Sequence, residues 1–304
     1  ALGLALDLDA ERWAQGSALA AHLGSLALLV VVSRRWWRAA GGGVWWPLAP
    51  LLVAVSPDVA IWATSGLESA LYVLLLLGAF TLLSAPGAPS PLRLGLAGLV
   101  TALACLTRPD GVLFAALAGV WLLGRFGLRH RATWIFAGAA WVVLVPFEIW
   151  RVAYYGDWLP NTYYAKGAYQ AWWGQGLVFA GVFFQRYWPL LLTLPAFGLL
   201  AVLHRRAPRD VHPDDGPPRG TLRFLLAFAL MYTLYVIRVG GGFMHARLLV
   251  PTIPFWALSA EGLVGRWRLG RDPATARPWL VPTVAGAVLC GVLALLPAPF
   301  DGVE

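Results

Sequence analysis

Apolar runs recur along the whole chain, and several approach the roughly 20 residues that a helix needs to cross a bilayer core of about 30 Å. Charged residues make up only 12% of the 304 positions and hydrophobic residues 59%, whereas soluble domains carry about 25% charged residues. So few charges cannot cover a water-facing surface. The sequence therefore predicts an all-α, polytopic transmembrane helical bundle with about 9–10 membrane segments and no soluble domain.

We expect one transmembrane module over residues 1–304, without an internal repeat. Its expected segments are Ser17–Val32, Val44–Ala60, Leu67–Leu83, Leu92–Leu106, Val112–Gly124, Thr133–Trp150, Leu177–Leu203, Leu222–Ile237, Leu248–Val264 and Trp279–Leu296. Prolines at positions 47, 50 and 57 interrupt the second segment, because proline breaks the helical hydrogen-bond ladder. The segment Leu177–Leu203 is long enough for two pieces, divided near Gln185 and Arg186, of which the first is interfacial.

Basic residues are distributed unevenly between alternate loops. The loops at 33–43, 84–93, 125–132, 204–223 and 265–278 hold 16 of the 23, and the other side holds seven. Since basic residues concentrate in cytoplasmic loops, these five loops are predicted to be cytoplasmic and the others extracytoplasmic. The protein is therefore expected in the cell inner (plasma) membrane. The dispersed clusters exclude a nucleic-acid groove, although the net charge is +8.

The chain offers little sign of a cofactor. Cys105 and Cys290 both lie in apolar segments and have neither metal-ligand nor disulfide-framework spacing. No phosphate-cradling Gly-Lys-Ser/Thr loop, nucleophile elbow or dinucleotide fingerprint is present. We expect no metal site and no cofactor, with a divalent cation left open. The first residues, Ala1 to Gly16, contain no signal peptide, and we expect that the chain continues from an upstream segment.

Glu68 is the first of the polar residues on the predicted outer face, where charges within a membrane protein are costly unless they are paired or line a wet cavity. It follows Ser65 and Gly66 at the start of a segment. One interpretation is a capping box, in which Ser65 caps the helix and Glu68 reaches back to the cap. The other is a carboxylate that lines an active cavity, and the two are compatible.

Arg108 and Asp110 flank Pro109 between two half-length segments. Broken helices at membrane depth are tolerated where they are buried in protein or line a cavity. The two residues can form an internal pair that fixes the hinge. Alternatively, Arg108 can meet an anionic headgroup such as a phosphate, which suits a planar guanidinium.

The longest outer polar segment runs from Tyr154 to Lys166, and a second outer segment contains His245. The first combines four tyrosines and an asparagine with the single lysine of the chain. An ammonium group suits a phosphate and aromatic rings suit sugar faces, although an interfacial aromatic belt explains the same residues. His245 follows a triple glycine that permits close backbone approach. It is either a general acid or base or a hydrogen-bonded loop histidine.

Four outer segments are distinctive in sequence. They read Thr-Ser-Gly-Leu-Glu (64–68), Leu-Thr-Arg-Pro-Asp-Gly (106–111), Tyr-Tyr-Gly-Asp-Trp-Leu-Pro-Asn-Thr-Tyr-Tyr-Ala-Lys (154–166) and Gly-Gly-Gly-Phe-Met-His-Ala-Arg (240–247). In this order they resemble the motifs of GT-C-type membrane glycosyltransferases. The resemblance is greatest to the terminal β-(1→2)-arabinofuranosyltransferases of the actinobacterial cell wall and their uncharacterised bacterial relatives, and it covers roughly residues 1–265.

The resemblance implies transfer of a sugar, arabinofuranose or a mannose-like one, from a polyprenyl-phosphate donor to a hydroxyl of an extracytoplasmic glycan. The implied partners are this donor, the glycan acceptor and membrane lipid. A carboxylate would act as general base and cations would stabilise the leaving phosphate. The implied substrate-binding residues are Arg108, Lys166 and Arg247 at the phosphate and Tyr155, Asn161, Tyr163 and His245 around the sugar.

The chain departs from the family in two places. The family's catalytic aspartate normally follows a first transmembrane helix, so we expect the base upstream of Ala1 and an inactive fragment, with His245, Glu68 and Asp110 as weak catalytic candidates. The family also tends to have aspartate where this chain has Gly242. The relatives' soluble C-terminal domain is likewise expected to be missing.

Two other functions compete with the transferase. A transporter or flippase for a lipid-linked sugar or a small anion would present polar or broken elements to both sides, often with repeat symmetry. A non-catalytic scaffold would not need four motif loops on one face. The crowding of the motifs on one side favours the enzyme.

Overall fold

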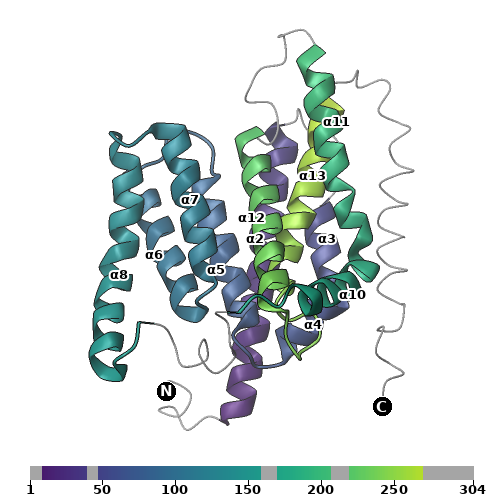
Figure 1. The fold of residues 1–304 in the computed structure, drawn as a ribbon. Coiled ribbons are helices and arrows are strands. Elements are labelled where there is room, and N and C mark those ends of the chain that lie inside the picture. The colour runs from purple at the N-terminus through teal and green to yellow at the C-terminus, as the bar shows by residue number, and fades with distance from the viewer. Residues whose placement is uncertain (1–8, 40–46, 159–169, 207–218, 270–304) are drawn as a thin grey trace, which may run out of the picture.

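The computed structural model describes residues 9–39, 47–158, 170–206 and 219–269, with side chains described as far as residue 199 and from 220 to 266. These residues form helices and no strand, which confirms the all-α prediction (Figure 1). The helices are α2 (Ala10–Ala39), α3 (Leu48–Ala54), α4 (Pro57–Thr64), α5 (Ser69–Leu83), α6 (Pro91–Thr107), α7 (Gly111–Phe126), α8 (Arg131–Tyr155), α10 (Trp173–Leu191), α11 (Thr193–Arg206), α12 (Arg219–Val239) and α13 (Ile253–Leu269), with a 3₁₀ turn at Val250–Thr252.

Four helical stretches of the described chain are long and apolar enough to cross a membrane: Ala10–Ala39, Arg131–Tyr155, Trp173–Leu199 and Gly220–Val239. A fifth span arises if α4 and α5, bent by 112°, count together. This is fewer than the 9–10 segments expected from the sequence, because several apolar runs fold into helices shorter than a full span. The expected segment Trp279–Leu296 lies outside the described residues.

In its described part, from residue 47 onward, the expected segment Val44–Ala60 is interrupted before Pro57, one of the prolines that predict a break. The chain forms α3 with seven residues and α4 with eight, divided at Ser56, whose hydroxyl accepts a hydrogen bond from the Val59 N–H as the cap of α4. Pro57 stands at the first position of α4, where its missing N–H costs nothing. Two short helices replace one span and turn α4 across the end of the bundle.

Two other breaks fall close to their predicted positions. Helix α10 kinks at Tyr187 and α11 begins at Thr193, so the predicted division of Leu177–Leu203 is present. Helices α6 and α7 meet at the predicted Arg108–Gly111 hinge. A Cβ atom on Gly111 would lie 2.8 Å from the Cys105 backbone, so this hinge requires glycine.

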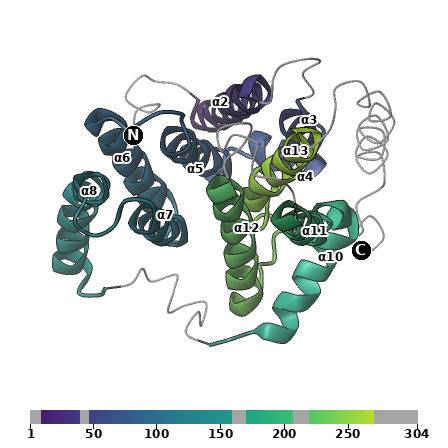
Figure 2. The same ribbon diagram turned by 90° about the horizontal axis from the view of Figure 1, so that it is seen from above.

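Helix pairs come close together where one helix contributes glycine. A Cβ atom on Gly98 would lie 2.3 Å from the Phe136 carbonyl oxygen of α8, and one on Gly176 would lie 1.8 Å from the Ile237 oxygen of α12. Such small-residue contacts are typical of membrane helices. Viewed along the bundle, α6, α7 and α8 stand on one side of α5, and α12 lies between them and the group of α10, α11 and α13 (Figure 2).

The polar turns gather at one end of the bundle. The α4–α5 turn, the α6–α7 hinge and the loop after α12 meet at the lower end of Figure 1. Their side chains also contact one another, since Arg247 bonds Glu68 across 179 residues of sequence. The folding of the helices therefore brings three of the four motif segments to a common place.

Candidate active site

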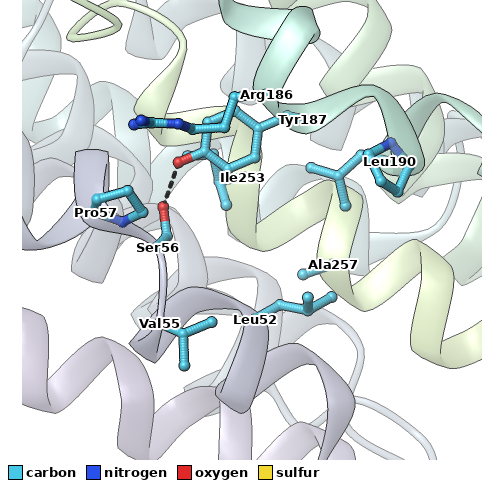
Figure 3. A pocket seen from close by; sticks show the side chains of 10 residues that line it. Leu52, Val55, Ser56, Pro57, Arg186, Tyr187, Leu190, Ile253 and Ala257 are labelled. Atoms are coloured by element: carbon cyan, nitrogen blue, oxygen red, sulfur yellow. Dashed lines mark hydrogen bonds between the residues drawn. The ribbon is translucent and has the colours of Figure 1, made fainter. Parts of the chain in front are cut away.

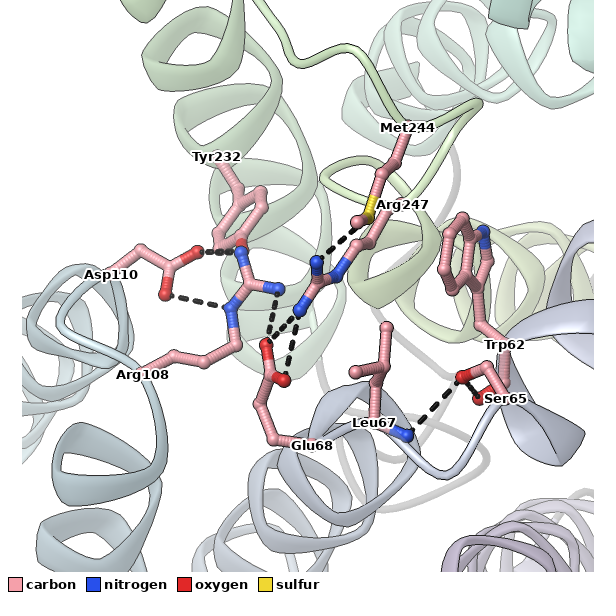
Figure 4. A network of polar contacts seen from close by, with 9 residues as sticks. All are labelled: Trp62, Ser65, Leu67, Glu68, Arg108, Asp110, Tyr232, Met244 and Arg247. Carbon is pink, nitrogen blue, oxygen red and sulfur yellow. Dashed lines mark hydrogen bonds and ion pairs between the residues drawn. The ribbon is translucent and has the colours of Figure 1, made fainter. Parts of the chain in front are cut away.

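Glu68 lies at the centre of a cluster of charges (Figure 4). The Nη2 atom of Arg247 donates to both carboxylate oxygens of Glu68, at 2.7 and 2.9 Å. The Nη1 atom of Arg108 lies 3.6 Å from Glu68 Oε1. Two arginines from separate motifs therefore share one carboxylate.

The predicted capping box is wrong. Ser65 ends helix α4 rather than beginning α5, and its hydroxyl donates to the Trp62 carbonyl oxygen and accepts from the Leu67 N–H. Glu68 occupies the cap position of α5 without a side-chain cap bond. The two arginines hold the carboxylate in place of a cap bond.

Arg108 and Asp110 form the internal pair that the sequence allowed. Arg108 donates through Nε and Nη2 to the two Asp110 oxygens, at 3.1 and 2.8 Å, and Asp110 also accepts from the Tyr232 hydroxyl. Both charged residues are less than 10% exposed. Burial alone would lower the pKa of Arg108, but Tyr232 and Asp110 outweigh it and raise the pKa above its usual value. The pair ties α12 to the α6–α7 hinge.

The cluster has a buried half and an accessible half. Arg108 and Asp110 are enclosed, whereas the side chains of Glu68 and Arg247 are 35% and 21% exposed. Two guanidinium and two carboxylate groups give the cluster no net formal charge. Because Glu68 and Arg247 are the more exposed residues of the cluster, an incoming anion contacts these two first.

A second cluster is centred on Asp58, which is only 1% exposed. Its Oδ1 atom lies 3.0 Å from His245 Nε2, and its Oδ2 accepts from the Tyr187 hydroxyl at 2.7 Å and lies 3.6 Å from Arg186. Ser56 also bonds the Tyr187 hydroxyl, at 2.6 Å. Sequence reasoning did not select Asp58 as a site residue. The signal that could have found it is an acid placed inside an apolar run.

Trp62 joins the two clusters. Its indole N–H donates to the His245 carbonyl oxygen at 3.0 Å, and the Arg247 guanidinium lies over its ring at 5.7 Å. Ala246, between the two, is buried and has φ of 54°. This left-handed conformation is strained for alanine. The side chains on either side of Ala246 contact different clusters: His245 contacts Asp58, and Arg247 contacts Glu68.

The glycines before this loop allow the close approach that the sequence predicted. Gly240 and Gly241 have φ of 86° and 73°, and a Cβ atom on them would lie 2.6 Å from Trp172 and 2.4 Å from Phe179. Gly242 differs, because a Cβ atom there would make only ordinary contact, 3.5 Å from Leu248. Only two of the three glycines are therefore required by the packing.

Of the remaining predicted residues, the structure describes Tyr155 alone. Asn161, Tyr163 and Lys166 lie outside the described residues. Tyr155 is exposed at the end of α8, where its ring contacts are with Trp150 and Tyr154 of the same helix. Within the described part of the chain, no three histidine, cysteine, aspartate or glutamate side chains come together as a metal site.

An apolar pocket borders the Asp58 cluster (Figure 3). Ser56, Arg186 and Tyr187 are its polar lining residues, and the Ser56–Tyr187 hydrogen bond crosses its upper part. The rest of the wall comes from α3, α4, α10 and α13, through Leu52, Val55, Pro57, Pro189, Leu190, Ile253 and Ala257. The pocket therefore offers an apolar surface beside a polar one.

Fold and clusters together define a multi-pass α-helical membrane protein with an arginine–carboxylate site at one end. The chain is similar to the terminal β-(1→2)-arabinofuranosyltransferase of Mycobacterium tuberculosis, with 31% identity over 259 residues, which are 74% of this chain and 41% of that protein. The enzyme of the same name from Corynebacterium glutamicum is 35% identical over 162 residues, 51% of this chain and 23% of that protein.

These similarities confirm the resemblance that the four motifs predict. The chain spans less than half of the length of either relative. No family model matches the sequence, and no solved structure matches it.

Proposed function

We propose that this chain forms the donor-binding part of a membrane enzyme that transfers a sugar, arabinofuranose or a mannose-like one, from a polyprenyl-phosphate donor to an acceptor hydroxyl of a glycan. The observation that carries the proposal is the convergence of Arg108 and Arg247 on one accessible carboxylate. Two guanidinium groups side by side suit a phosphate. The names of the two relatives, both arabinofuranosyltransferases, support sugar transfer as the reaction.

In the proposed reaction, the acceptor oxygen attacks the anomeric carbon of the donor sugar and loses its proton to a general base. The bond between the anomeric carbon and the phosphate oxygen breaks, and its electron pair leaves with the polyprenyl phosphate. Negative charge therefore grows on the phosphate. Arg247 and Arg108 stabilise that charge from fixed positions. Stabilisation of developing charge by preorganised groups is usually the largest single contribution to catalysis.

The three weak base candidates differ in their surroundings. Asp110 is buried against Arg108 and Tyr232, so it holds Arg108 rather than reaching the acceptor. Glu68 is held by both arginines. His245 is 29% exposed in its side chain and contacts the buried Asp58, which suits an oriented proton acceptor.

The apolar pocket between α3, α4, α10 and α13 gives the prenyl chain of the donor a place. Its wall is mostly aliphatic, and Arg186 is the one cation among its lining residues. An isoprenoid chain gains free energy by leaving water for such a surface. The proposed donor therefore has its headgroup at the arginines and its first isoprene units toward this pocket.

The transporter alternative is not favoured. The relatives are named as transferases, and the charged clusters of the described chain that include the motif residues gather at one end. We propose that this end is extracytoplasmic, because 16 of the 23 basic residues fall in the opposite loops and basic loops stay in the cytoplasm.

The proposal is tested with membranes that contain the full-length gene product. Polyprenyl-phosphate arabinose or mannose is supplied with an oligosaccharide acceptor, and the product is measured by mass spectrometry. Transfer from at least one donor is expected, with none from the same membranes lacking the protein. No transfer from any such donor contradicts the proposed function.

One further variant tests whether Lys166 belongs to the donor site, in the same assay. Lys166→Ala is expected to weaken donor use strongly, and unchanged dependence on donor concentration would remove Lys166 from the site.

A further inference from the structure

Glu68 has the contacts of a bound anion rather than those of a structural carboxylate. Its Oε1 atom lies between the two arginines, 2.7 Å from Arg247 and 3.6 Å from Arg108. Its Oε2 also accepts from Arg247, at 2.9 Å. Two oxygens on one centre, facing two guanidinium groups, is also the arrangement in which a phosphate binds arginines.

The helix that carries Glu68 does not depend on this carboxylate. Helix α5 begins at Ser69 without a side-chain cap bond from Glu68. The Glu68 side chain is 35% exposed, so the carboxylate can move into water by rotating its own side chain. The buried Asp110, 5% exposed in its side chain, has no such route and remains with Arg108.

The charges of the cluster match one particular kind of ligand. With Glu68 in place, two guanidinium groups face two carboxylates and the sum is zero. When Glu68 leaves, the cluster carries one positive charge. A phosphate diester carries one negative charge and restores neutrality, whereas a carboxylate left in place would repel it.

We propose that Glu68 occupies the phosphate position of the free protein and that a singly charged phosphodiester displaces it onto the solvent side. This inference rests on the proposed function and deepens it. The phosphodiester takes over the contacts that Glu68 makes with Arg247 and with Nη1 of Arg108, the nitrogen that does not contact Asp110. Asp110 keeps Arg108 in place during the exchange. Glu68 is therefore a competitor of the donor, and its removal strengthens donor binding.

The first experiment measures binding to the purified full-length gene product in detergent. The probe is farnesyl methyl phosphate, a singly charged phosphodiester, and farnesyl methyl ether is its uncharged control. Glu68→Gln is compared with Glu148→Gln. Glu148 pairs with Arg151 and its side chain is 34% exposed, so this control removes an equally accessible acid from an ion pair and changes net charge by the same amount.

Glu68→Gln removes a charge-assisted contact that the ligand must otherwise break, so it is expected to lower the dissociation constant about tenfold. Glu148→Gln is expected to bind as the unaltered protein does, and Arg247→Gln about tenfold more weakly. Unchanged or weaker binding in Glu68→Gln, together with loss in Arg247→Gln, overturns the displacement and leaves the proposed function standing. Unchanged binding in Arg247→Gln contradicts the phosphate role itself, and with it both proposals.

A second experiment needs no substitution. A water-soluble carbodiimide modifies exposed carboxylates, and mass spectrometry of peptides measures the modification of Glu68 and Glu148. Addition of farnesyl methyl phosphate is expected to increase modification of Glu68 several-fold because the displaced carboxylate loses its ion pairs, and to leave Glu148 unchanged. Protection of Glu68 by the probe, or an equal increase with the uncharged ether, overturns the displacement.

Discussion

The two ends of the bundle each contain a carboxylate that joins distant helices, but the carboxylates are held differently. Glu261 of α13 accepts from the Ser33 hydroxyl and the Trp37 indole of α2 and from the Ala49 N–H of α3, at 3.1 Å for Trp37 and 2.8 Å for Ala49. It is 2% exposed. Glu68 is held by two arginines and its side chain is 35% exposed.

The difference separates a structural carboxylate from an exchangeable one. Glu261 is enclosed by three neutral donors that belong to two helices, α2 and α3, so its removal would take one acceptor away from each of them. Glu68 leaves behind two cations that a phosphate can satisfy. The Arg108–Asp110 pair is intermediate, because it is buried like Glu261 and charged like Glu68.

The largest effect is expected for Glu261, at the end of the bundle opposite Glu68. Glu261→Ala should lower the free energy of unfolding by about 3 kcal/mol, since three buried donors lose their acceptor. Thermal unfolding in detergent measures the change. Glu148→Ala, which removes a half-buried ion pair within one helix, should change stability by about 0.5 kcal/mol. Equal stability of the two variants would refute the structural role of Glu261.

Asp110→Asn should destabilise the protein by about 2 kcal/mol, because the buried Arg108 loses its charged partner. The same unfolding assay applies, and Asp157→Asn at an exposed position is the control. A stable Asp110→Asn protein that no longer binds phosphodiester would instead place Asp110 in the exchangeable half of the cluster.

Asp58→Asn tests whether the second cluster orients His245. Asparagine still accepts from Tyr187, so the fold should persist. Turnover should fall about tenfold, the effect of one charge-assisted hydrogen bond, with KM nearly unchanged. Steady-state kinetics of the full-length gene product measure both constants. A rise in KM without a change in kcat would assign Asp58 to donor binding instead.

The left-handed residue between His245 and Arg247 should respond to side-chain shape. Ala246→Val is expected to cost about 1 kcal/mol, because a β-branched residue is strained at this φ. Ala246→Gly should be at least as stable as the unaltered protein, since glycine adopts this conformation freely. Unfolding temperatures decide the order, and a less stable glycine variant would contradict the strain at Ala246.

The smallest effect is expected at Gly242, where the motif resemblance implies aspartate. Gly242→Asp should change stability by no more than about 0.5 kcal/mol, as for an ordinary surface substitution. Gly241→Asp is the matched control, because a Cβ atom there would lie 2.4 Å from Phe179. Comparable loss of fold in both variants would show that the third glycine is required after all.

Features that depend on local sequence could be predicted, and those that depend on distant partners could not. The apolar runs and the Arg108–Gly111 hinge are local, and both are present in the structure. The fate of Glu68 depends on Arg247, 179 residues away. The local Ser65–Glu68 spacing therefore indicated a capping box that does not form.

Asp58 was missed for the same reason. Its partners Tyr187 and His245 lie more than a hundred residues further along the chain, and no motif spacing connects them. The described chain has four helical stretches of full span length, and hydropathy alone does not distinguish such a span from an apolar run that α3 and α4 divide into two short helices. The meeting of motif segments at one end, in contrast, follows from helix topology alone.

The most direct test compares Arg247→Ala with Glu261→Ala in one sugar-transfer assay, with rates expressed per folded full-length protein. Arg247→Ala is expected to remain folded and to lose about a hundredfold in turnover, because a group that stabilises developing charge is removed. The folded fraction of Glu261→Ala should retain the rate of the unaltered protein. An Arg247→Ala protein with the normal rate, or folded Glu261→Ala protein as inactive as Arg247→Ala, would contradict the division between the exchangeable carboxylate of Glu68 and the structural carboxylate of Glu261.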